Sequence, residues 1–298
     1  MNVGVTGAAG FLGGYVCGRL AEDGHAVRAM VRKTSRTTFL ERLGVEIVVG
    51  EMGDVQTLKP FVDGCEAVID AAVDFSICRS DPMAHFRVNL LGSLSVLELC
   101  RQGGARLVFI STGAVHSRIL DDRPLDEAHP LWPDSTYGAY KAAVEAFLPA
   151  YRAQFGFNGC ALRPTQIYGL HLTKPRKSHW YGLVRQVLAG ESIETDRGGK
   201  IVHVEDVAEA AAAALRAEDV AGESFELTDC HIYDQTVAEF VREISGIDCE
   251  IADVKGTGPK NRIVSDKART TLGVALNRGH EGVRAYVGQL VELLRKGG

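Results

Sequence analysis

Along the first half of the chain, short apolar runs rich in β-branched residues alternate with longer stretches whose apolar residues recur at helical spacing. The short runs predict strands at Asn2–Thr6, Ala26–Val31, Val45–Val49, Ala67–Asp70, Leu107–Ile110 and Cys160–Leu162. The longer stretches predict helices at Gly10–Glu22, Val55–Val62, Pro82–Gln102 and Ser135–Phe155. After Pro164 the alternation weakens, and the pattern predicts one strand at Ser224–Thr228 and helices at His179–Ala189, Glu205–Arg216, Gln235–Ser245, Asp266–Leu272 and Glu281–Arg295.

Regular alternation of apolar strands with helices is typical of a parallel sheet covered on both faces. We therefore predict an α/β protein with a Rossmann-type doubly wound parallel sheet. Residues 1–165 are expected to form this nucleotide-binding domain, and residues 199–220 are expected to rejoin it. Residues 166–198 and 221–298 are expected to form a smaller, partly interleaved C-terminal α/β lobe that binds the substrate.

A glycine-rich turn follows the first strand and opens the first helix, with Gly7, Gly10 and Gly13 in G-x-x-G-x-x-G spacing. Gly7 allows a tight turn, Gly10 lets backbone amides approach a pyrophosphate, and Gly13 permits close packing of helix on strand. The start of a helix also favours an anion. A turn that binds nothing is the alternative, but the strand–turn–helix context favours a dinucleotide site.

The second predicted strand ends in Arg32 and Lys33, and no carboxylate stands at that end. A carboxylate there commonly binds the ribose 2′-hydroxyl of NAD, whereas an Arg accommodates the 2′-phosphate of NADP. We therefore expect NADP as the preferred cofactor and NAD as the other option. Two solvated loop cations would give the same pattern.

Tyr137 and Lys141 form a Y-x-x-x-K pair, which shares one face of a helix. A tyrosine has a pKa of about 10, and a nearby ammonium is expected to lower that pKa and make the hydroxyl an acid–base group. Ser111 and Thr112 end a buried strand, where one hydroxyl can hydrogen-bond the reacting oxygen. Alternatively, Tyr137 and Lys141 are a surface pair without a chemical role, and the hydroxyls of Ser111 and Thr112 only cap the end of the strand.

Composition excludes other classes of protein. The formal net charge of −5 argues against nucleic acid as the main partner, and no apolar run is long enough to span a membrane. Neither the seven cysteines nor the histidines have metal-ligand spacing, so no metal site is expected. The scattered cysteines fit a reducing compartment, and we recognise no signal peptide, so a cytoplasmic protein is expected.

Eight ordered segments resemble the extended short-chain dehydrogenase/reductases, also called the NAD-dependent epimerase/dehydratase family. The resembling segments are GAAGFLG, GEMGD, DAAV, RVNLLGSLSVLEL, FISTGAV, YGAYK, LRPTQIYG and HVEDVAEA. The resemblance implies Thr112, Tyr137 and Lys141 as catalytic residues. It implies cofactor contacts at Gly7, Gly10, Phe11, Leu12, Gly13, Arg32, Lys33, Glu51, Met52, Ala71, Ala72, Val73, Asn89, Ser111, Tyr137, Lys141, Pro164 and Ile167.

Within this family the chain looks nearest to the dihydroflavonol-4-reductase-like reductases. The resemblance implies an NAD(P)-dependent oxidoreductase acting on a carbonyl or secondary alcohol of a small molecule, with Tyr137 as the acid–base residue. A nucleotide-sugar epimerase or dehydratase that retains NAD is the first alternative, and a non-catalytic NAD(P)-binding regulator is the second. Arg32 and His116 depart from the epimerase pattern. Candidate substrate residues are Phe75, His116, Trp180 and Tyr181.

The helices at Pro82–Gln102 and Ser135–Phe155 often pair with those of a second subunit in this family, so a homodimer is plausible.

Overall fold

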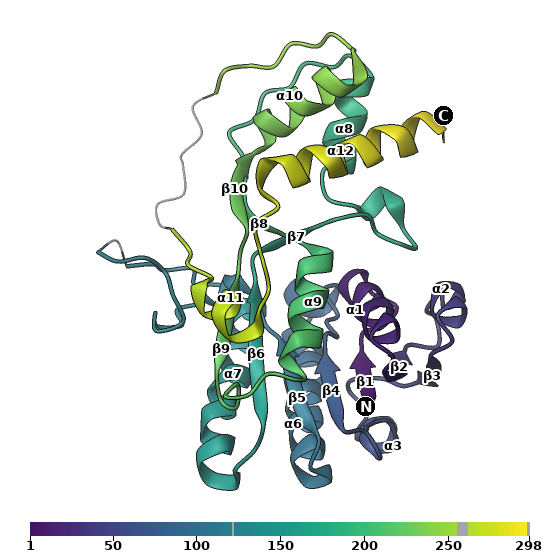
Figure 1. Ribbon diagram of the computed structural model, residues 1–298, viewed down its shortest axis with the longest axis vertical. Helices are drawn as coiled ribbons and strands as arrows, with labels where there is room; N and C mark the ends of the chain where they lie inside the picture. The colour runs from purple at the N-terminus through teal and green to yellow at the C-terminus, as the bar shows by residue number, and fades with distance from the viewer. Residues whose placement is uncertain (121, 255–261, 297–298) are drawn as a thin grey trace.

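A seven-stranded parallel sheet organises the larger part of the molecule (Figure 1). The computed structural model describes residues 1–120, 122–254 and 262–296. The strands lie in the order β3-β2-β1-β4-β5-β6-β9. Their bounds are β1 Asn2–Thr6, β2 Ala26–Val31, β3 Glu46–Val49, β4 Ala67–Asp70, β5 Arg106–Ile110, β6 Gly159–Pro164 and β9 Ser224–Leu227. This order and the parallel pairing confirm the predicted doubly wound fold.

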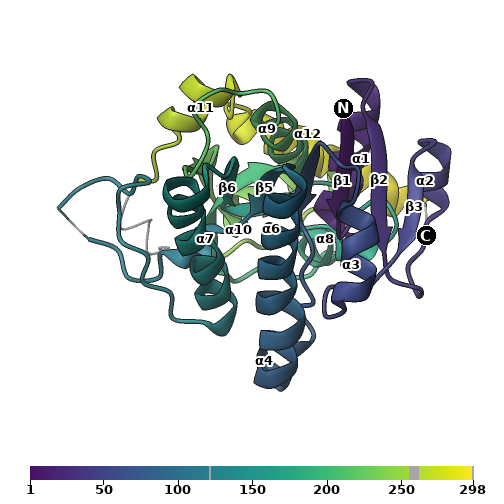
Figure 2. The same cartoon turned by 90° about the horizontal axis from the view of Figure 1, so that it is seen from below.

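Helices cover both faces of this sheet, and Figure 2 shows α6 and α7 on one side with α9 and α11 on the other. One face carries α3 Val55–Val62, α6 Leu91–Gly103 and α7 Thr136–Phe155. The other carries α1 Phe11–Glu22, α9 Val204–Ala214 and α11 Asp266–Leu272. The short α2, Thr38–Arg42, lies beside α1. Because strand side chains alternate between faces, Val108 packs with α1 and α9 while Leu107 packs with α3 and α6.

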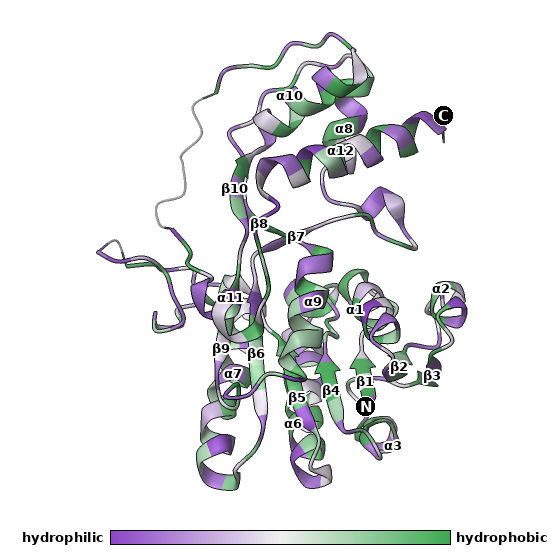
Figure 3. Cartoon of the chain, viewed as in Figure 1, coloured by the Kyte–Doolittle hydropathy of each residue, from purple (hydrophilic) through white to green (hydrophobic). Residues whose placement is uncertain are grey.

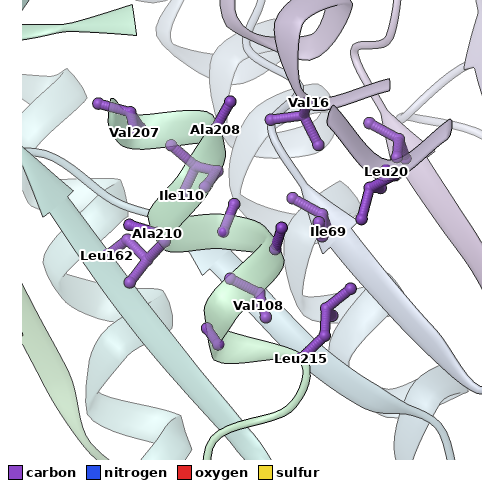
Figure 4. Close-up of a cluster of buried hydrophobic side chains, with 14 of the residues drawn as sticks. Val16, Leu20, Ile69, Val108, Ile110, Leu162, Val207, Ala208, Ala210 and Leu215 are labelled. Atoms are coloured by element: carbon purple, nitrogen blue, oxygen red, sulfur yellow. The ribbon is translucent and has the colours of Figure 1, made fainter. Parts of the chain in front are cut away.

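The core between α1, α9 and the sheet is built from small and branched apolar side chains (Figure 4). Val16 and Leu20 from α1 meet Ile69 and Val108 from the strands. The facing surface of α9 is made of alanines, of which Ala210, Ala211, Ala212 and Ala214 are fully buried. Short side chains let α9 lie close to both α1 and the sheet, so this layer has little room for a larger residue.

A second lobe stands above the carboxyl ends of the large sheet (Figure 1). Its three-stranded sheet has the order β10-β8-β7, with β7 Gln166–Tyr168, β8 Gly198–His203 and β10 Cys230–Tyr233. Three helices pack around it: α8 Tyr181–Leu188, α10 Asp234–Ser245 and α12 Gly279–Lys296. Figure 3 shows both hydrophilic and hydrophobic colours along α10 and α12, as expected for helices that pack on one face.

Several segments differ from the sequence prediction. The predicted strand near 224 pairs with β6 in the large sheet, and α11 packs against it, although residues 221–298 were expected to form the second lobe. Residues 199–220 were expected to rejoin the large domain. Within them, α9 packs on the large sheet, whereas β8 pairs within the small sheet. The short strands β7, β8 and β10 were not predicted, because runs of three to six residues carry little periodicity and β8 also begins with two glycines.

The helix predicted at Pro82–Gln102 is interrupted. It begins as α5, Pro82–His85, after the single turn α4, Ile77–Ser80, and then widens into a π-helical segment at Phe86–Leu90 before α6 begins. Asn89 lies in the wide segment, and its side chain contacts His85 and the backbone of Asp74. The widened turn thus points the buried side-chain amide of Asn89 toward the loop that follows β4.

The alanine layer gives a prediction about stability. Ala211→Leu should lower the free energy of unfolding by about 1–3 kcal/mol, because the added atoms force α9 away from the sheet. Chemical denaturation followed by circular dichroism measures the change. Ala153→Leu makes the same substitution at an exposed position of α7 and should change stability by less than about 0.5 kcal/mol. Equal effects of the two substitutions would contradict the close packing of α9.

Candidate active site

The turn between β1 and α1 has the geometry of an anion-binding site. Gly7 has φ +65°, and a Cβ there would lie 2.8 Å from the Ala71 carbonyl oxygen. A Cβ on Gly13 would overlap the Gly7 carbonyl, and the Gly10 amide donates to that same oxygen at 2.8 Å. No side chain caps the start of α1, so amides of its first turn, including those of Phe11 and Leu12, can meet a phosphate. These residues fit the diphosphate of a dinucleotide.

Thr6 and Asp70 fix the strand ends beside this turn. The Thr6 hydroxyl donates to Asp70 Oδ1 at 2.5 Å and accepts from the amides of Ala71 and Ala72, each at 3.1 Å. Both side chains are buried. The backbone from Ala71 to Val73 is therefore held against the glycine turn, where these residues were predicted to contact a cofactor. The sequence analysis did not identify the role of Thr6, because a threonine at the end of a strand carries no distinctive pattern.

Arg32 and Lys33 follow β2, and both are exposed. Arg32 Nη1 lies 3.2 Å from a carboxylate oxygen of Asp74. Hydrogen bonds from Ser76, and to a smaller extent the Arg32 charge, hold the pKa of Asp74 below its ordinary value, although burial acts in the opposite direction. An anion at the end of β2 would therefore compete with Asp74 for Arg32. Glu51 and Met52, the residues predicted near the adenine, follow β3, with Glu51 exposed and Met52 buried.

Two predicted cofactor residues have side chains engaged inside the protein. Asn89 Oδ1 accepts from the Asp74 amide at 2.9 Å, and Asn89 Nδ2 donates to the Asp74 carbonyl at 3.1 Å. The Ser111 hydroxyl donates to buried Glu145. Contact of these two residues with a cofactor stays a prediction. Their amide and hydroxyl position the loop after β4 and the end of β5, respectively.

The start of α7 brings the predicted catalytic residues together. The Ser135 hydroxyl caps the helix by accepting from the Gly138 amide at 3.1 Å. A Cβ on Gly138 would lie 2.5 Å from the Ala114 carbonyl oxygen, so only glycine lets α7 press against the turn after Thr112. The Thr112 side chain lies near enough to Tyr137 to lower the pKa of the Tyr137 hydroxyl. The two hydroxyls, predicted separately from sequence, are thus neighbours.

Lys141 is buried one helical turn beyond Tyr137. Its Nζ donates to the Ile110 carbonyl at 2.5 Å and lies 4.4 Å from the centre of the Phe109 ring. Burial lowers the pKa of Lys141 to about 8, although the charge of Asp70 acts in the opposite direction. An ammonium held in this way is close to the acid–base pair without being exposed to solvent.

Burial raises the pKa of Tyr137, and the Thr112 side chain only partly opposes this effect. The expectation that Lys141 lowers the tyrosine pKa is therefore wrong for the protein by itself. The reason is that desolvation of the phenolate outweighs the favourable interactions at this site. Tyr137 is thus a protonated phenol at neutral pH, which is the form that can donate a proton.

A cleft of about 410 Å³ lies between the two lobes. Thr112, Pro164 and neighbouring residues line one wall, and the other wall comes from the small sheet and includes Lys200 and His231. The sequence analysis did not select Lys200 as a site residue, and it treated His231 as one of several dispersed histidines. Cross-strand pairing brings these two residues together, which no local sequence pattern reveals.

The four predicted substrate residues lie in different environments. Phe75 is exposed, and its ring lies 5.2 Å from that of Tyr137. His116 is buried with Nε2 2.9 Å from a Glu226 oxygen, so its side chain is engaged inside the protein. Trp180 packs in the second-lobe core and donates to Asp234 at 2.7 Å. Tyr181 is half-buried at the start of α8.

Pro164 and Ile167 were predicted beside the nicotinamide. Pro164 lines the cleft, whereas Ile167 packs partly buried against the core on the α1 side of the large sheet. Across residues 1–120, 122–254 and 262–296, no group of three His, Cys, Asp or Glu side chains is placed to hold a metal ion. In the same ranges, every helix is too short or too polar to cross a bilayer.

Comparison with known proteins places this geometry in a family. The sequence model of the NAD dependent epimerase/dehydratase family matches residues 3–227. A farnesyl-dihydroquinoline-oxide ketoreductase of Stigmatella aurantiaca is 35% identical over 175 residues, which are 57% of this chain and 51% of that protein. A dihydroflavonol 4-reductase-like protein of Synechocystis is 33% identical over 156 residues, 50% of this chain and 45% of that protein. The chain thus spans about half the length of these two relatives.

The solved structure of UDP-glucose 4-epimerase from Thermus thermophilus, in complex with NAD, resembles the whole molecule. It is 27% identical, has a TM-score of 0.80, and covers 97% of this chain and 99% of its own. Reductases and an epimerase therefore both stand among the similar proteins. The family match, which spans most of the chain, and the glycine turn agree with each other: the chain belongs to the NAD-dependent epimerase/dehydratase family, the extended short-chain dehydrogenase/reductases.

Proposed function

We propose that the protein is an NAD(P)-dependent oxidoreductase that interconverts a carbonyl and a secondary alcohol of a small molecule. The observation that carries this proposal is that Tyr137 lies beside Thr112, with Thr112 on the wall of a cleft and the Tyr137 pKa raised. A neutral phenol is ready to donate a proton to the oxygen of a ketone as that oxygen gains negative charge. The likeness to a ketoreductase supports the same direction of reaction.

Each residue has a role in this proposal. When bound, a nicotinamide cofactor supplies the hydride donor or acceptor. The glycine turn and the first turn of α1 hold its diphosphate, and Lys141 binds its ribose. Thr112 donates a hydrogen bond to the substrate oxygen, and Tyr137 gives that oxygen a proton. Positioning and hydrogen bonding, rather than covalent catalysis by the protein, would supply the rate.

The main test replaces the acid–base hydroxyl. Tyr137→Phe should lower turnover of ketones by about 10²–10⁴-fold, the usual contribution of general acid catalysis, while the cofactor Kd changes by less than about threefold. Oxidation of NADPH or NADH over a panel of ketones and aldehydes measures turnover.

Tyr140→Phe is a matched control. It removes a hydroxyl that is buried without a hydrogen-bond partner among the described residues, three positions further along the same helix. This variant should retain turnover within about threefold. Full activity of Tyr137→Phe would show that Tyr137 is not the acid. A wild-type protein that binds the cofactor yet reduces nothing on the panel would favour the non-catalytic regulator.

An epimerase that retains NAD is the second candidate, and the whole-chain likeness to an NAD-bound UDP-glucose 4-epimerase favours it. Mass spectrometry of the cofactor carried through purification separates the two. A reductase that exchanges its cofactor should purify with little bound nucleotide. Stoichiometric NAD that survives desalting would overturn the reductase proposal in favour of the epimerase.

We also propose that NADP is the preferred cofactor, because Arg32 and Lys33 stand at the end of β2, where a guanidinium can bind a phosphate in bidentate fashion. NADPH should bind more tightly than NADH in equilibrium titrations. Arg32→Ser should weaken NADPH binding by about tenfold and leave NADH binding unchanged. Arg42→Ser, which removes an exposed cation from the end of α2, should affect neither. Tighter binding of NADH by the wild type would refute the preference.

A homodimer through α6 and α7 is a further proposal. These two helices pack beside each other and leave large apolar side chains exposed, including Leu91 at 55% and Phe147 at 42%. Covering such residues with a second copy removes apolar area from water. Sedimentation of the wild type should give a dimer at micromolar concentration, and Leu91→Glu with Phe147→Glu should give a monomer. Leu43→Glu, at an exposed site outside these helices, should leave the dimer intact. A monomeric wild type would end this proposal.

A further inference from the structure

The cleft between the lobes has two chemically different walls. On the large-domain side, Thr112 and its neighbours carry hydroxyls, small side chains and backbone groups. On the small-lobe side, Lys200 and His231 are the ionisable side chains. No Asp or Glu belongs to the described lining of this cleft. A ligand that reaches from Thr112 to the small lobe therefore meets positive charge at its far end.

The small sheet places these two side chains together. Lys200 lies on β8 and His231 on β10, and they are directly opposite each other in an antiparallel pair. Residues opposite each other in such a pair project from the same face of the sheet. The two residues before Lys200 are glycines, so no side chain from them fills the space beside the lysine. Both polar groups consequently face the same region of the cleft.

Lys200 is half-buried and makes neither a hydrogen bond nor an ion pair through its ammonium within the described chain. Its nearest compensating charge is Glu226, which is itself buried and bonded to His116 and Arg163. Partial burial lowers the pKa of Lys200 in spite of Glu226, and burial together with the charge of Lys200 lowers the pKa of His231. A half-buried ammonium without an ion pair is stabilised when a ligand brings an anion next to it.

We propose that Lys200, with His231 beside it, binds an anionic group of the substrate, a carboxylate or a phosphate, at the end of the cleft remote from Thr112. This inference rests on the proposed function, because it takes the carbonyl to lie at Thr112 and Tyr137. Lys200 is then a specificity residue that selects acidic carbonyl compounds. His231 adds a hydrogen-bond donor to the same group.

The test measures binding rather than turnover. Three ketones with one skeleton serve as probes: 4-acetylbenzoate, 4-acetylphenyl phosphate and methyl 4-acetylbenzoate. Each is titrated by calorimetry into the protein saturated with oxidised NADP or NAD, whichever binds more tightly. At least one anionic probe should bind with a Kd that is at least tenfold lower than that of the neutral ester. The stronger of the two anions identifies the group as a carboxylate or a phosphate.

Variants link the preference to the residue. Lys200→Gln should bring the ratio of anion to ester affinity below about threefold, and Lys200→Arg should largely restore it. His231→Asn should reduce the ratio by a smaller factor. Lys177→Gln, which removes an exposed cation outside the cleft, should leave the ratio unchanged. Cofactor affinity and thermal unfolding of each variant show that the fold is intact.

Two results would overturn the proposal: a wild-type protein with no preference for either anion, including one that binds none of the probes, and a preference that survives in Lys200→Gln. The outcome is independent of the hydride-transfer test. A protein that prefers the anion through Lys200 but reduces no ketone would retain this site and lose the proposed reaction.

Discussion

The arrangement of β6, α7 and β9 beneath the cleft depends on one buried guanidinium. Arg163 on β6 lies between two carboxylates, at 2.6 Å from Glu145 of α7 and 3.0 Å from Glu226 of β9. All three side chains are nearly inaccessible to solvent. Loss of one member of such a group leaves an uncompensated charge in the interior, which costs about 3–5 kcal/mol. The position of α7 over the large sheet, and the pairing of its last two strands, are therefore fixed electrostatically as well as by packing.

This charged group is linked by single hydrogen bonds to the segment that carries Thr112, and it includes a residue of the helix that carries Tyr137; these are the two proposed acid–base residues. Glu145 accepts from Ser111, which precedes Thr112, and the same helix carries Tyr137 and Lys141. Glu226 holds His116, which follows the turn after Thr112. The hydroxyl of Thr112 and the phenol of Tyr137 are thus positioned from below by groups that never enter the cleft. Rigid support of this kind is what acid–base catalysis needs, since its rate depends on small differences in distance.

The glycine turn and the strand–helix alternation are local signals, so the large sheet could be predicted apart from the place of its last strand, β9. The Tyr137–Lys141 spacing is local too, and its catalytic role stays a prediction. Sequence-based prediction failed where the outcome depends on tertiary contacts. Ser111 and His116 stand in a segment that resembles the family, yet their side chains bond buried carboxylates more than 30 residues away. Lys200 carries no signal by itself, because strand pairing alone brings it beside His231.

The path of the chain between the lobes has a consequence for how this protein can change. The chain leaves the large domain after β6, returns with α9, leaves again with β10, returns with α11 and ends in α12 of the second lobe. No single cut separates the two lobes. The second lobe as a whole therefore cannot be exchanged as one contiguous segment without including α9, β9 and α11 of the large domain.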